Sequence, residues 1–449
     1  MQTDLSATIS APGLTPIDYR GHRASILYPA SLLLRTSQPV TPSPSPIQVG
    51  QKLAPHANPL LSQASPGIPA AISPMQASLP DVQPAGFVAL TPTGPLPPLP
   101  QPFHLSLAYR NNDGTTNLTG KLLAETCKQR AVPRSDLANW MLSLGIDANR
   151  LTCPSLSAQF AIAEASPIQK LICSCLPGDG RTSISDTLAH VFPAEVLAGC
   201  LYISHSFGLP ITIAVDSARP PTTLLQLARG TTARIASTPS TYPAADPILL
   251  TLSHSSARLR PGSSPAAAGL IFLDAAAAFD IGSRVLNLTP SLVPTVAYLA
   301  DSPPQIVFVP RATPILAFIA ALPAADAPLA SSDPCAEQIF LDDLPRNLHP
   351  THTHTIDTAS RTLHIRPPSL RRPPQPCVQC GWCAEVCPTR MRPALLLDAV
   401  QSLPASPAHS DKVAATAGLH ACIECGLCNY ICPSALDLLA AVRQLRKVN

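Results

Sequence analysis

The sequence predicts a multidomain chain of mixed α/β and α+β structure that ends in a small helical domain built around cysteines. Three observations predict this class. The chain has 449 residues, enough for several domains at roughly 150 residues each. Helical and strand-like patterns alternate between residues 118 and 215, as they do in α/β domains. Eight of the 14 cysteines lie between Cys377 and Cys432, so the C-terminal region has a chemistry of its own.

Composition excludes a nucleic-acid-binding surface. The net charge is +3, close to neutral for this length, whereas a nucleic-acid surface would show a concentrated basic face. The short basic run of Arg366, Arg371 and Arg372 indicates a solvated loop. The 54 prolines predict many loops and edge strands, because proline lacks a backbone donor.

The sequence predicts no membrane-spanning segment. The longest apolar stretch, residues 266–281, is interrupted by Asp274 and Asp280 and is too short to span a bilayer. The N-terminus lacks a basic region followed by an apolar run, so no signal peptide is expected. We therefore expect a cytoplasmic protein that meets a membrane only peripherally.

The N-terminal part, residues 1–102, is predicted to be a small β unit with a proline-rich linker. Strand-like segments at residues 24–28, 47–53 and 86–90 are bounded by turn-forming residues. The run at residues 95–100 is typical of a polyproline linker.

Two further units are expected before the cysteines. Residues 103–218 are predicted to form an α/β domain, with a helix over 135–142 that Ser135 caps and buried strands over 170–173 and 210–215. Residues 219–325 are predicted to form a small α+β unit, and residues 326–370 a linker. The strands expected in the α+β unit lie near residues 248–252, 269–273 and 305–309.

Two near-copies of a cysteine run define the last domain, residues 371–449. Both runs read C-x₂-C-x₂-C-x₃-C-P, the spacing of bacterial ferredoxins with two [4Fe–4S] clusters, in which the fourth cysteine of each run ligates the other cluster. Gly381 and Gly426 let the backbone curl close to the clusters. The predicted metal ligands are Cys377, Cys380, Cys383 and Cys432 for the first cluster, and Cys422, Cys425, Cys428 and Cys387 for the second.

Helices are expected to lead away from the fourth cysteine of each run. Pro388 and Pro433 would occupy their first turns, where no amide donor is needed. Ser434 and Asp437 resemble a capping box. Apolar faces are predicted for the helix that Pro393 opens and for the helix over residues 438–445.

The alternative for these eight cysteines is a pair of structural zinc sites. Zinc takes four ligands, commonly as two separated pairs, and the two runs do not have that arrangement.

Apolar side chains interleave with the cysteines and are expected to keep water from the clusters. No acid/base constellation accompanies them, so no catalytic residue is predicted and the domain is expected to relay electrons. The apolar residues are Trp382, Val386, Leu427 and Ile431.

Cys173 and Cys175 lie outside this domain, in a predicted strand. They could pair or bind a metal ion. Buried free thiols are the interpretation that we favour, since unpaired cysteine is among the most buried residue types.

Three stretches together resemble the C subunit of the Rnf (Rsx) ion-translocating electron transport complex, the RnfC family. The first is the pair of cysteine runs with a spacer of 34 residues (422 − 387 − 1) between Cys387 and Cys422. The second is the proline–glycine turn and strand over residues 260–274, similar to the family's ubiquitin-like (SLBB-type) unit. The third is residues 215–220, similar to the end of its α/β domain. The resemblance implies a barrel-sandwich-like N-terminal unit, an α/β domain, an SLBB-like unit and a helical ferredoxin-like domain.

The family's site for flavin and NADH is not carried over to this chain. The resemblance places its glycine-rich loop at residues 144–151, where a single glycine, Gly145, remains. The family's acidic stretch would be residues 173–177, which contain no acid. A phosphate cradle needs backbone amides that side chains do not obstruct, so this site is degenerate and FMN and NAD are not expected as cofactors.

The resemblance implies an electron-transfer subunit of a membrane-bound complex, lying peripherally on the cytoplasmic face of the inner membrane. Its partners would be the other subunits and a redox donor or acceptor protein. One alternative is a scaffold or docking subunit whose clusters are structural. Another is an NADH dehydrogenase subunit whose site has diverged.

Overall fold

The structure is a computed structural model, and the account below rests on the residues that it describes. They are residues 13–19, 22–28, 32–36, 76–78, 86–93, 119–143, 153–165, 167–178, 184–255, 259–286, 292–299, 305–310, 313–321, 339–341, 355–356, 362–365, 373–402 and 407–448. The predicted strand over 47–53, the loop over 144–151 and the basic run of residues 366–372 lie outside them.

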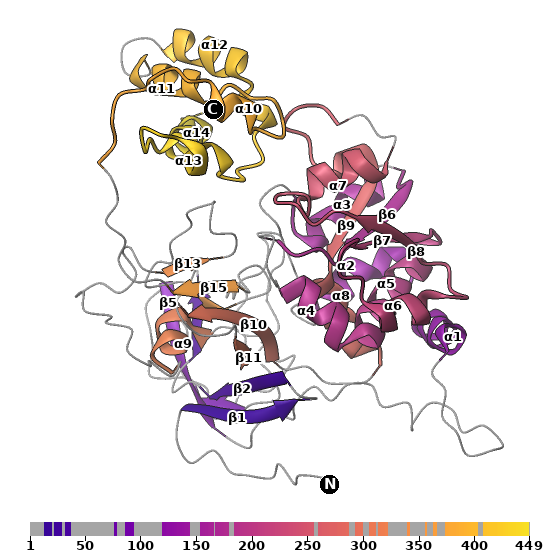
Figure 1. The fold of residues 1–449 in the computed structure, drawn as a ribbon. Coiled ribbons are helices and arrows are strands. Elements are labelled where there is room, and N and C mark those ends of the chain that lie inside the picture. The colour runs from indigo at the N-terminus through magenta and orange to yellow at the C-terminus, as the bar shows by residue number, and fades with distance from the viewer. Residues whose placement is uncertain are drawn as a thin grey trace, which may run out of the picture.

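A four-stranded parallel sheet forms the centre of the α/β domain, with strand order β8-β7-β6-β9 (Figure 1). The strands predicted near 170–173, 210–215 and 269–273 are confirmed within it. All residues of β7 and β9 are buried, as expected of parallel strands that helices cover on both faces. The strand bounds are Lys170–Ser174 for β6, Ile211–Asp216 for β7, Arg234–Thr238 for β8 and Leu270–Asp274 for β9.

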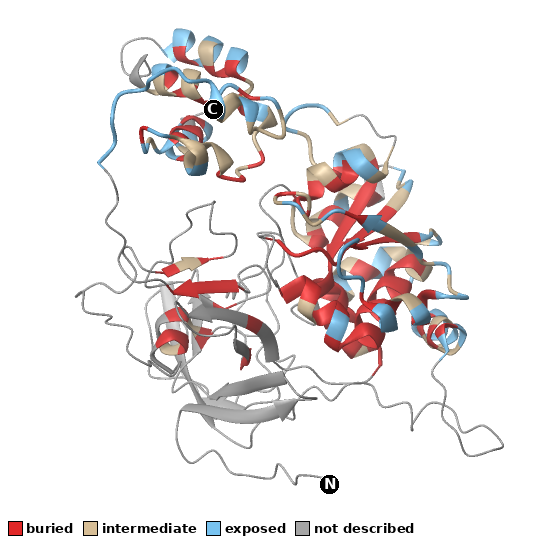
Figure 2. Cartoon of the chain, in the orientation of Figure 1, coloured by how far each residue is buried: buried red, intermediate tan, exposed pale blue. Residues whose placement is uncertain are grey.

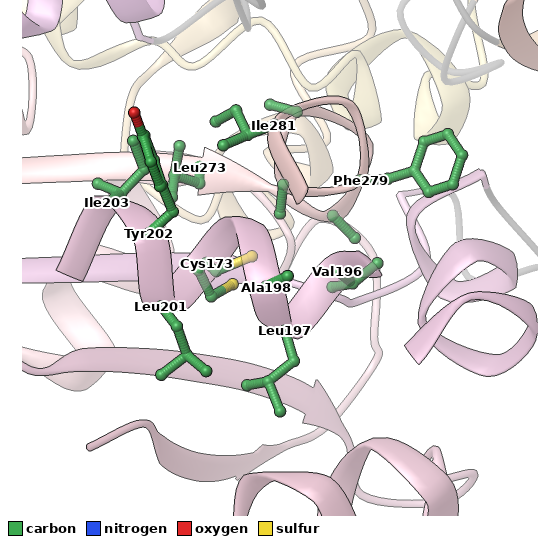
Figure 3. Packing of buried hydrophobic residues seen from close by; sticks show 14 of the residues in the cluster. Cys173, Val196, Leu197, Ala198, Leu201, Tyr202, Ile203, Leu273, Phe279 and Ile281 are labelled. Atoms are coloured by element: carbon green, nitrogen blue, oxygen red, sulfur yellow. The ribbon is translucent and has the colours of Figure 1, made fainter. Parts of the chain in front are cut away.

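Helices pack around this sheet, and α5 lies against α8 in its core. Leu197 and Leu201 of α5 point one way, while Tyr202 and Ile203 point the other (Figure 3). The helix predicted over 135–142 is confirmed as α2, but it begins at Arg134, so Ser135 lies inside the helix and the prediction that it caps the helix is wrong. The helices are α1 (Gly120–Arg130), α2 (Arg134–Ser143), α3 (Leu156–Ala165), α4 (Ile184–Val191), α5 (Pro193–Phe207), α6 (Thr222–Ala228), α7 (Pro247–His254) and α8 (Ala275–Val285).

The strand predicted near residues 248–252 is wrong, because this segment is helix α7. The carboxylate of Asp246 accepts a hydrogen bond from the backbone N–H of Ile248 at 2.9 Å, and Pro247 occupies the first helical position. An aspartate N-cap followed by proline is a strong helix start. The run of apolar residues after it therefore belongs to a helix.

The predicted boundary at residue 218 differs from the observed sheet. Strand β8 pairs with β7, and β9 pairs with β6, both in parallel. Both β8 and β9 follow residue 218 in the sequence, as does α8. The α/β domain therefore continues through residue 286, and the segment assigned to a separate α+β unit supplies half of its strands.

A six-stranded sheet draws on three of the predicted segments, with strand order β1-β2-β11-β10-β15-β13. Strand β2 pairs in parallel with β11, although about 280 residues separate them in the chain. Strands β13 and β15 lie in the segment predicted to be a linker. The bounds are Gly13–Tyr19 for β1, His22–Tyr28 for β2, Leu292–Leu299 for β10, Gln305–Pro310 for β11, Ile339–Leu341 for β13 and Thr362–Ile365 for β15.

Smaller β elements accompany this sheet. Strand β5 (Gly86–Thr93) pairs with both β3 (Leu32–Thr36) and β4 (Gln76–Ser78). Strands β12 (Thr313–Pro314) and β14 (Thr355–Ile356) pair with each other. In the sequence, β12 precedes helix α9 (Ile315–Ala321) and β14 follows it. The strands predicted at 24–28, 86–90 and 305–309 are thus confirmed as β2, β5 and β11. Phe308 of β11 contacts Phe192 at the start of α5 edge to face, with ring centroids 6.3 Å apart.

Among the described residues, no single helix has the length and hydropathy needed to span a membrane. Helices α4 and α5 meet that criterion only when taken together, and they join at a bend of 103°.

Candidate iron–sulfur centre

Five helices form the C-terminal module, which has a small apolar core of its own. Leu396 of α11, Ala414 of α12 and Leu439 of α14 are all buried in this core. Cys387 and Cys422 pack against it, so the core holds one cysteine from each run. The helices are α10 (Trp382–Glu385), α11 (Pro393–Ser402), α12 (Pro407–Ala417), α13 (Leu427–Ile431) and α14 (Leu438–Val448).

The backbone of the module repeats with the same 45-residue offset as its cysteines (422 − 377 = 45). All four non-glycine residues with positive φ in the described part of the chain lie here. Gln379 and Glu424, with φ of 55° and 53°, precede the second cysteine of each run. Arg390 and Ala435, with φ of 59° and 52°, follow the fourth cysteine by three positions. Because such conformations are uncommon outside glycine, their recurrence at matched positions shows that both runs follow one path.

The two predicted glycines begin the short helices of the runs. Gly381 and Gly426 have φ of 81° and 76°, and each caps the helix that follows it. The backbone N–H of Ala384 donates to the carbonyl oxygen of Gly381 at 2.9 Å, and that of Asn429 to Gly426 at 3.0 Å. Glycine is therefore required here by backbone conformation.

The helices predicted to start at the fourth cysteines begin later. Pro388 and Pro433 lie in turns, and α11 and α14 start at Pro393 and Leu438. The left-handed residues three positions after each cysteine interrupt a helical path at this point. The helix that Pro393 opens is confirmed.

The predicted capping box is wrong for the same reason. Asp437 caps α14 directly, since its carboxylate accepts from the backbone N–H of Ala440 at 2.9 Å. The hydroxyl of Ser434 donates instead to the carbonyl oxygen of Pro376 at 2.9 Å. The backbone N–H of Gln375 donates to the carbonyl oxygen of Ser434, also at 2.9 Å. These bonds hold the segment after Cys432 against the start of the first run.

Three thiols of the first run lie within electrostatic reach of one another. Burial raises the pKa of the Cys383 thiol, and hydrogen bonds from the backbone N–H groups of Ala394 and Ala384 oppose that rise. The charges of Cys377 and Cys380 raise the same pKa. The three thiols of the first run therefore lie near one another.

Cys387 lies with the second run, although it belongs to the first. Burial raises the pKa of the Cys428 thiol to about 12. The charges of Cys422 and Cys425 raise it further, and so does that of Cys387. This grouping agrees with the prediction that the fourth cysteine of the first run serves the second cluster.

The residues present fit a [4Fe–4S] cluster in their chemistry and backbone. Cysteine thiolates are the usual ligands of such clusters, and hydrogen bonds to the sulfurs tune them. The backbone N–H of Glu424 donates to Sγ of Cys422 at 3.3 Å. Left-handed residues within a loop also turn successive N–H groups toward an anionic group. Each run supplies two such residues between its first and third cysteines.

No group of three or more His, Cys, Asp or Glu side chains that could hold one metal ion occurs in the part of the chain that the structure describes. In a [4Fe–4S] cube each thiolate binds a different iron atom, so its four ligands do not converge on a single point.

The two runs differ sharply in exposure despite their matched backbones (Figure 2). Val378 is 66% exposed, whereas Ile423, its counterpart in the second run, is 3% exposed. Cys377 and Cys380 are exposed, and Cys425 is buried. Trp382, which was expected to shield the first cluster from water, is 50% exposed. The first run thus faces solvent.

Residues from the α/β domain reach the second run. The hydroxyl of Tyr242, in the turn between β8 and α7, donates to the carbonyl oxygen of Cys425 at 2.5 Å. A Cβ atom built on Gly262, in the turn before β9, would lie 3.4 Å from Cβ of His420. Gly262 belongs to the proline–glycine turn that the sequence singled out, whereas nothing in the sequence indicated a role for Tyr242.

An arginine within the module also contacts the second run, and sequence reasoning missed it. Arg446 of α14 donates to the carbonyl oxygen of Cys422 at 2.5 Å and pairs with Glu424 at 2.6 Å. Arg443 pairs with the same carboxylate at 3.2 Å. Arg443 and Arg446 are three residues apart on one helix, which is a signal of a shared charged face, but their partner is distant in sequence.

Comparison with known proteins identifies the module. Residues 376–437 match the family described as 4Fe-4S dicluster domain. The C-terminal module is a 4Fe–4S dicluster domain. No curated protein sequence matches the chain.

Part of the chain is similar to two crystal structures of NAD+-reducing [NiFe]-hydrogenase, both at 13% sequence identity. In the air-oxidized state the TM-score is 0.41, with 73% of this chain and 62% of the hydrogenase chain covered. In the H2-reduced state the TM-score is 0.44, with 77% and 66% covered. The match spans less than two thirds of each hydrogenase chain.

Cys173 and Cys175 are buried free thiols, as predicted. Both lie at the end of β6, and the side chains of residues 173–176 are buried. Hydrogen bonding between the two thiols and burial raise the pKa of Cys175 well above its usual value. The segment aligned with the family's acidic stretch is therefore part of the domain core.

Proposed function

We propose that this chain is an electron-transfer subunit that relays single electrons through two [4Fe–4S] clusters within a membrane-associated, RnfC-like oxidoreductase complex. The observation that supports this best is the position of Cys387 near the second run, as the proposed exchange of fourth cysteines requires. Cys387 acts electrostatically on Cys428 of the second run. The segment after Cys432 is hydrogen-bonded to the start of the first run through Ser434. Such an exchange places two clusters side by side in one small domain.

Each part of the module has a role in this proposal. The clusters, when bound, supply reversible one-electron transfer. Cys377, Cys380, Cys383 and Cys432 would hold the first, and Cys422, Cys425, Cys428 and Cys387 the second. Backbone N–H groups such as that of Glu424 favour the thiolate form of the ligands. The buried Ile423 keeps water from the second run.

The exposed side of the first run is the proposed place of electron exchange with another redox protein. Val378 and Trp382 provide apolar surface beside two exposed cysteines, and surface aromatic residues are common at the centre of protein interfaces. We further propose that the chain lies peripherally on the cytoplasmic face of the inner membrane, and that electrons enter from a partner instead of from NADH bound to the α/β domain.

We propose that the chain is divided into three structural parts. The α/β domain comprises residues 119–286, and the dicluster domain lies within residues 371–449. The segments on either side of the α/β domain contribute strands to one β-rich part, which carries the proposed resemblance to barrel-sandwich and SLBB-type units. Strand pairing between β2 and β11 supports this joining.

The test is metal analysis and low-temperature EPR of chain purified without oxygen. We expect about eight irons and eight inorganic sulfides per chain, from two cubes of four. Dithionite should produce the broadened spectrum of two reduced clusters that interact. NADH added to a parallel sample should leave the clusters oxidised. Zinc in place of iron would refute the proposal, and reduction by NADH would instead indicate a dehydrogenase subunit.

A further inference from the structure

We propose that Tyr242 of the α/β domain is a positioning residue that raises the reduction potential of the second cluster. Its hydroxyl donates to the carbonyl oxygen of Cys425, which is one of the predicted ligands. The two residues are 183 positions apart in the chain. The inference rests on the proposed electron-relay function and adds to it a residue from outside the dicluster domain.

The backbone around Tyr242 is held by its own turn. The N–H of Ala244 donates to the carbonyl oxygen of Thr241 at 2.7 Å, and that of Asp246 to Pro243 at 2.9 Å. Pro243 and Asp246 are buried, and the Asp246 carboxylate caps α7. The ring of Tyr242 therefore extends from a fixed support, and the hydroxyl is placed by the fold of the α/β domain.

A second contact between the two domains lies close by. Gly262 faces His420, which is two residues before Cys422, closely enough that a Cβ atom built on Gly262 would lie 3.4 Å from Cβ of His420. Gly262 has a φ of +82°, so the turn that carries it is built for glycine. The two contacts, at His420 and at Cys425, bracket the cysteines with which the second run begins. The equivalent part of the first run, residues 373–381, is exposed.

The direction of the effect follows from charge. A cluster gains a negative charge on reduction, so a donor dipole that points toward it favours the reduced state and makes the potential less negative. The hydroxyl of Tyr242 offsets part of the negative charge on the Cys425 carbonyl oxygen. Arg446 acts in the same direction at the carbonyl oxygen of Cys422. The hydrogen bond from Tyr242 is partly buried and Cys425 is only 8% exposed, so solvent screens the Tyr242 dipole less there than at the surface.

The experiment is a redox titration of the full chain followed by low-temperature EPR. Tyr242→Phe removes the donor and keeps the ring. We expect one cluster to shift to a more negative midpoint potential while the other stays unchanged. Tyr430→Phe is the matched control, because it removes a hydroxyl from a tyrosine of the module that is 80% exposed. It should shift neither cluster.

Two more variants identify the cluster and guard against misfolding. Arg446→Gln should shift the same EPR signal in the same direction as Tyr242→Phe, because both donors serve the second run. Replacement of Tyr242 by 2,3-difluorotyrosine keeps the shape of the side chain and makes the hydroxyl a stronger donor. This variant should move the potential the opposite way, to a less negative value.

The outcomes separate this inference from the proposed function. A chain that binds no iron refutes the electron-relay function itself. A chain with about eight irons whose two potentials are unchanged in both Tyr242 variants refutes only the role of Tyr242. Equal shifts of both clusters also refute it, since a donor at Cys425 acts on one cluster only. Shifts of the same sign in the two variants refute it too, because loss of the donor and a stronger donor should move the potential in opposite directions.

Discussion

Ile423 and Val378 occupy equivalent positions in the two cysteine runs, and one is buried while the other is exposed. The exposed fractions are 3% and 66%. The backbone at both positions is followed by a left-handed residue, so local conformation does not explain the difference. The second run is contacted by Tyr242 of the α/β domain and by Arg446 of α14, whereas residues 373–381 around the first run are exposed. A repeated motif has thus become two unequal sites.

This asymmetry predicts unequal responses to matched substitutions. Ile423→Ala should weaken retention of the second cluster, because truncation of a buried isoleucine costs about 2–5 kcal/mol. Val378→Ala should change cluster retention little, since solvent already surrounds that side chain. The measurement is iron released to a chelator over time at a fixed urea concentration, followed by the loss of visible absorbance.

The control is the double variant, in which the two effects should add if the sites are independent. Faster iron release from Val378→Ala than from Ile423→Ala would contradict the burial of the second run.

The exchange of fourth cysteines predicts which cluster each replacement affects. Cys387→Ser should perturb the second cluster, since Cys387 lies with Cys428. Cys432→Ser should perturb the first. Each variant is expected to fall to about half of the eight irons, or to show one altered EPR signal. The Arg446→Gln variant supplies the assignment, because Arg446 contacts Cys422.

Cys383→Ser is the matched comparison for Cys432→Ser, and both should alter the same signal. If Cys387→Ser and Cys383→Ser altered the same signal instead, each run would hold its own cluster and the exchange would be absent.

The sequence was sufficient to predict the module because its signal is local. Four cysteines and a glycine within eleven positions determine where the chain must turn, and Gly381 and Gly426 have the positive φ that such turns require. The helix starts after Cys387 and Cys432 were predicted too early. Arg390 and Ala435 adopt left-handed conformations, which neither residue type predicts.

The domain boundaries could not be predicted because they depend on pairing between distant segments. Strand β8 has the same local pattern whether it pairs with β7 or begins a new unit. Only its parallel pairing with β7 in the folded structure assigns it to the α/β sheet. The same holds for Tyr242, whose partner Cys425 lies 183 residues away. The strand predicted near residues 248–252 is wrong for a different reason: a short apolar run fits a strand or a helix equally well, and here the Asp246 cap decides for the helix.

At the crossing of α5 and α8, the addition of a single methyl group to a glycine should strongly destabilise the domain. A Cβ atom built on Gly282 would lie 1.8 Å from the carbonyl oxygen of Glu195, and one on Gly199 would lie 1.9 Å from that of Ala278. Both obstacles are backbone atoms, so the helices themselves would have to move apart. Gly282→Ala should therefore cost about 3 kcal/mol, measured as a lower urea midpoint by far-ultraviolet circular dichroism.

Gly208→Ala provides a comparison outside the helix crossing. Gly208 has a φ of 66° and no atom near its built Cβ, so the cost there is conformational, about 1 kcal/mol. An equal or smaller effect of Gly282→Ala would show that the two helices are not in close contact.

His254 predicts that the α/β domain loses stability as the pH falls below about 6.5. Burial lowers the pKa of this imidazole, and the nearby Lys170 ammonium lowers it further. Its Nε2 lies 2.9 Å from the hydroxyl of Thr238. Because the unfolded chain takes up the proton near its ordinary value of 6.5 while the folded chain resists it, the unfolded state binds more protons in this range. Stability should therefore rise with pH up to about 6.5 and level off above it.

The measurement is the urea midpoint of the α/β domain at pH 7.5 and 5.5, compared with that of His254→Gln. The variant keeps a hydrogen-bonding group near Thr238 but cannot be protonated, so the difference between its two midpoints should shrink. His205, whose pKa burial also lowers, leaves a residual dependence in the variant. Lys170→Gln should act partway on the pH dependence, because it removes the smaller of the two causes that lower the pKa of His254, and it also removes the Lys170 Nζ donor to the carbonyl oxygen of His254. A pH dependence as large in His254→Gln as in the parent chain would mean that folding does not change the pKa of the His254 imidazole.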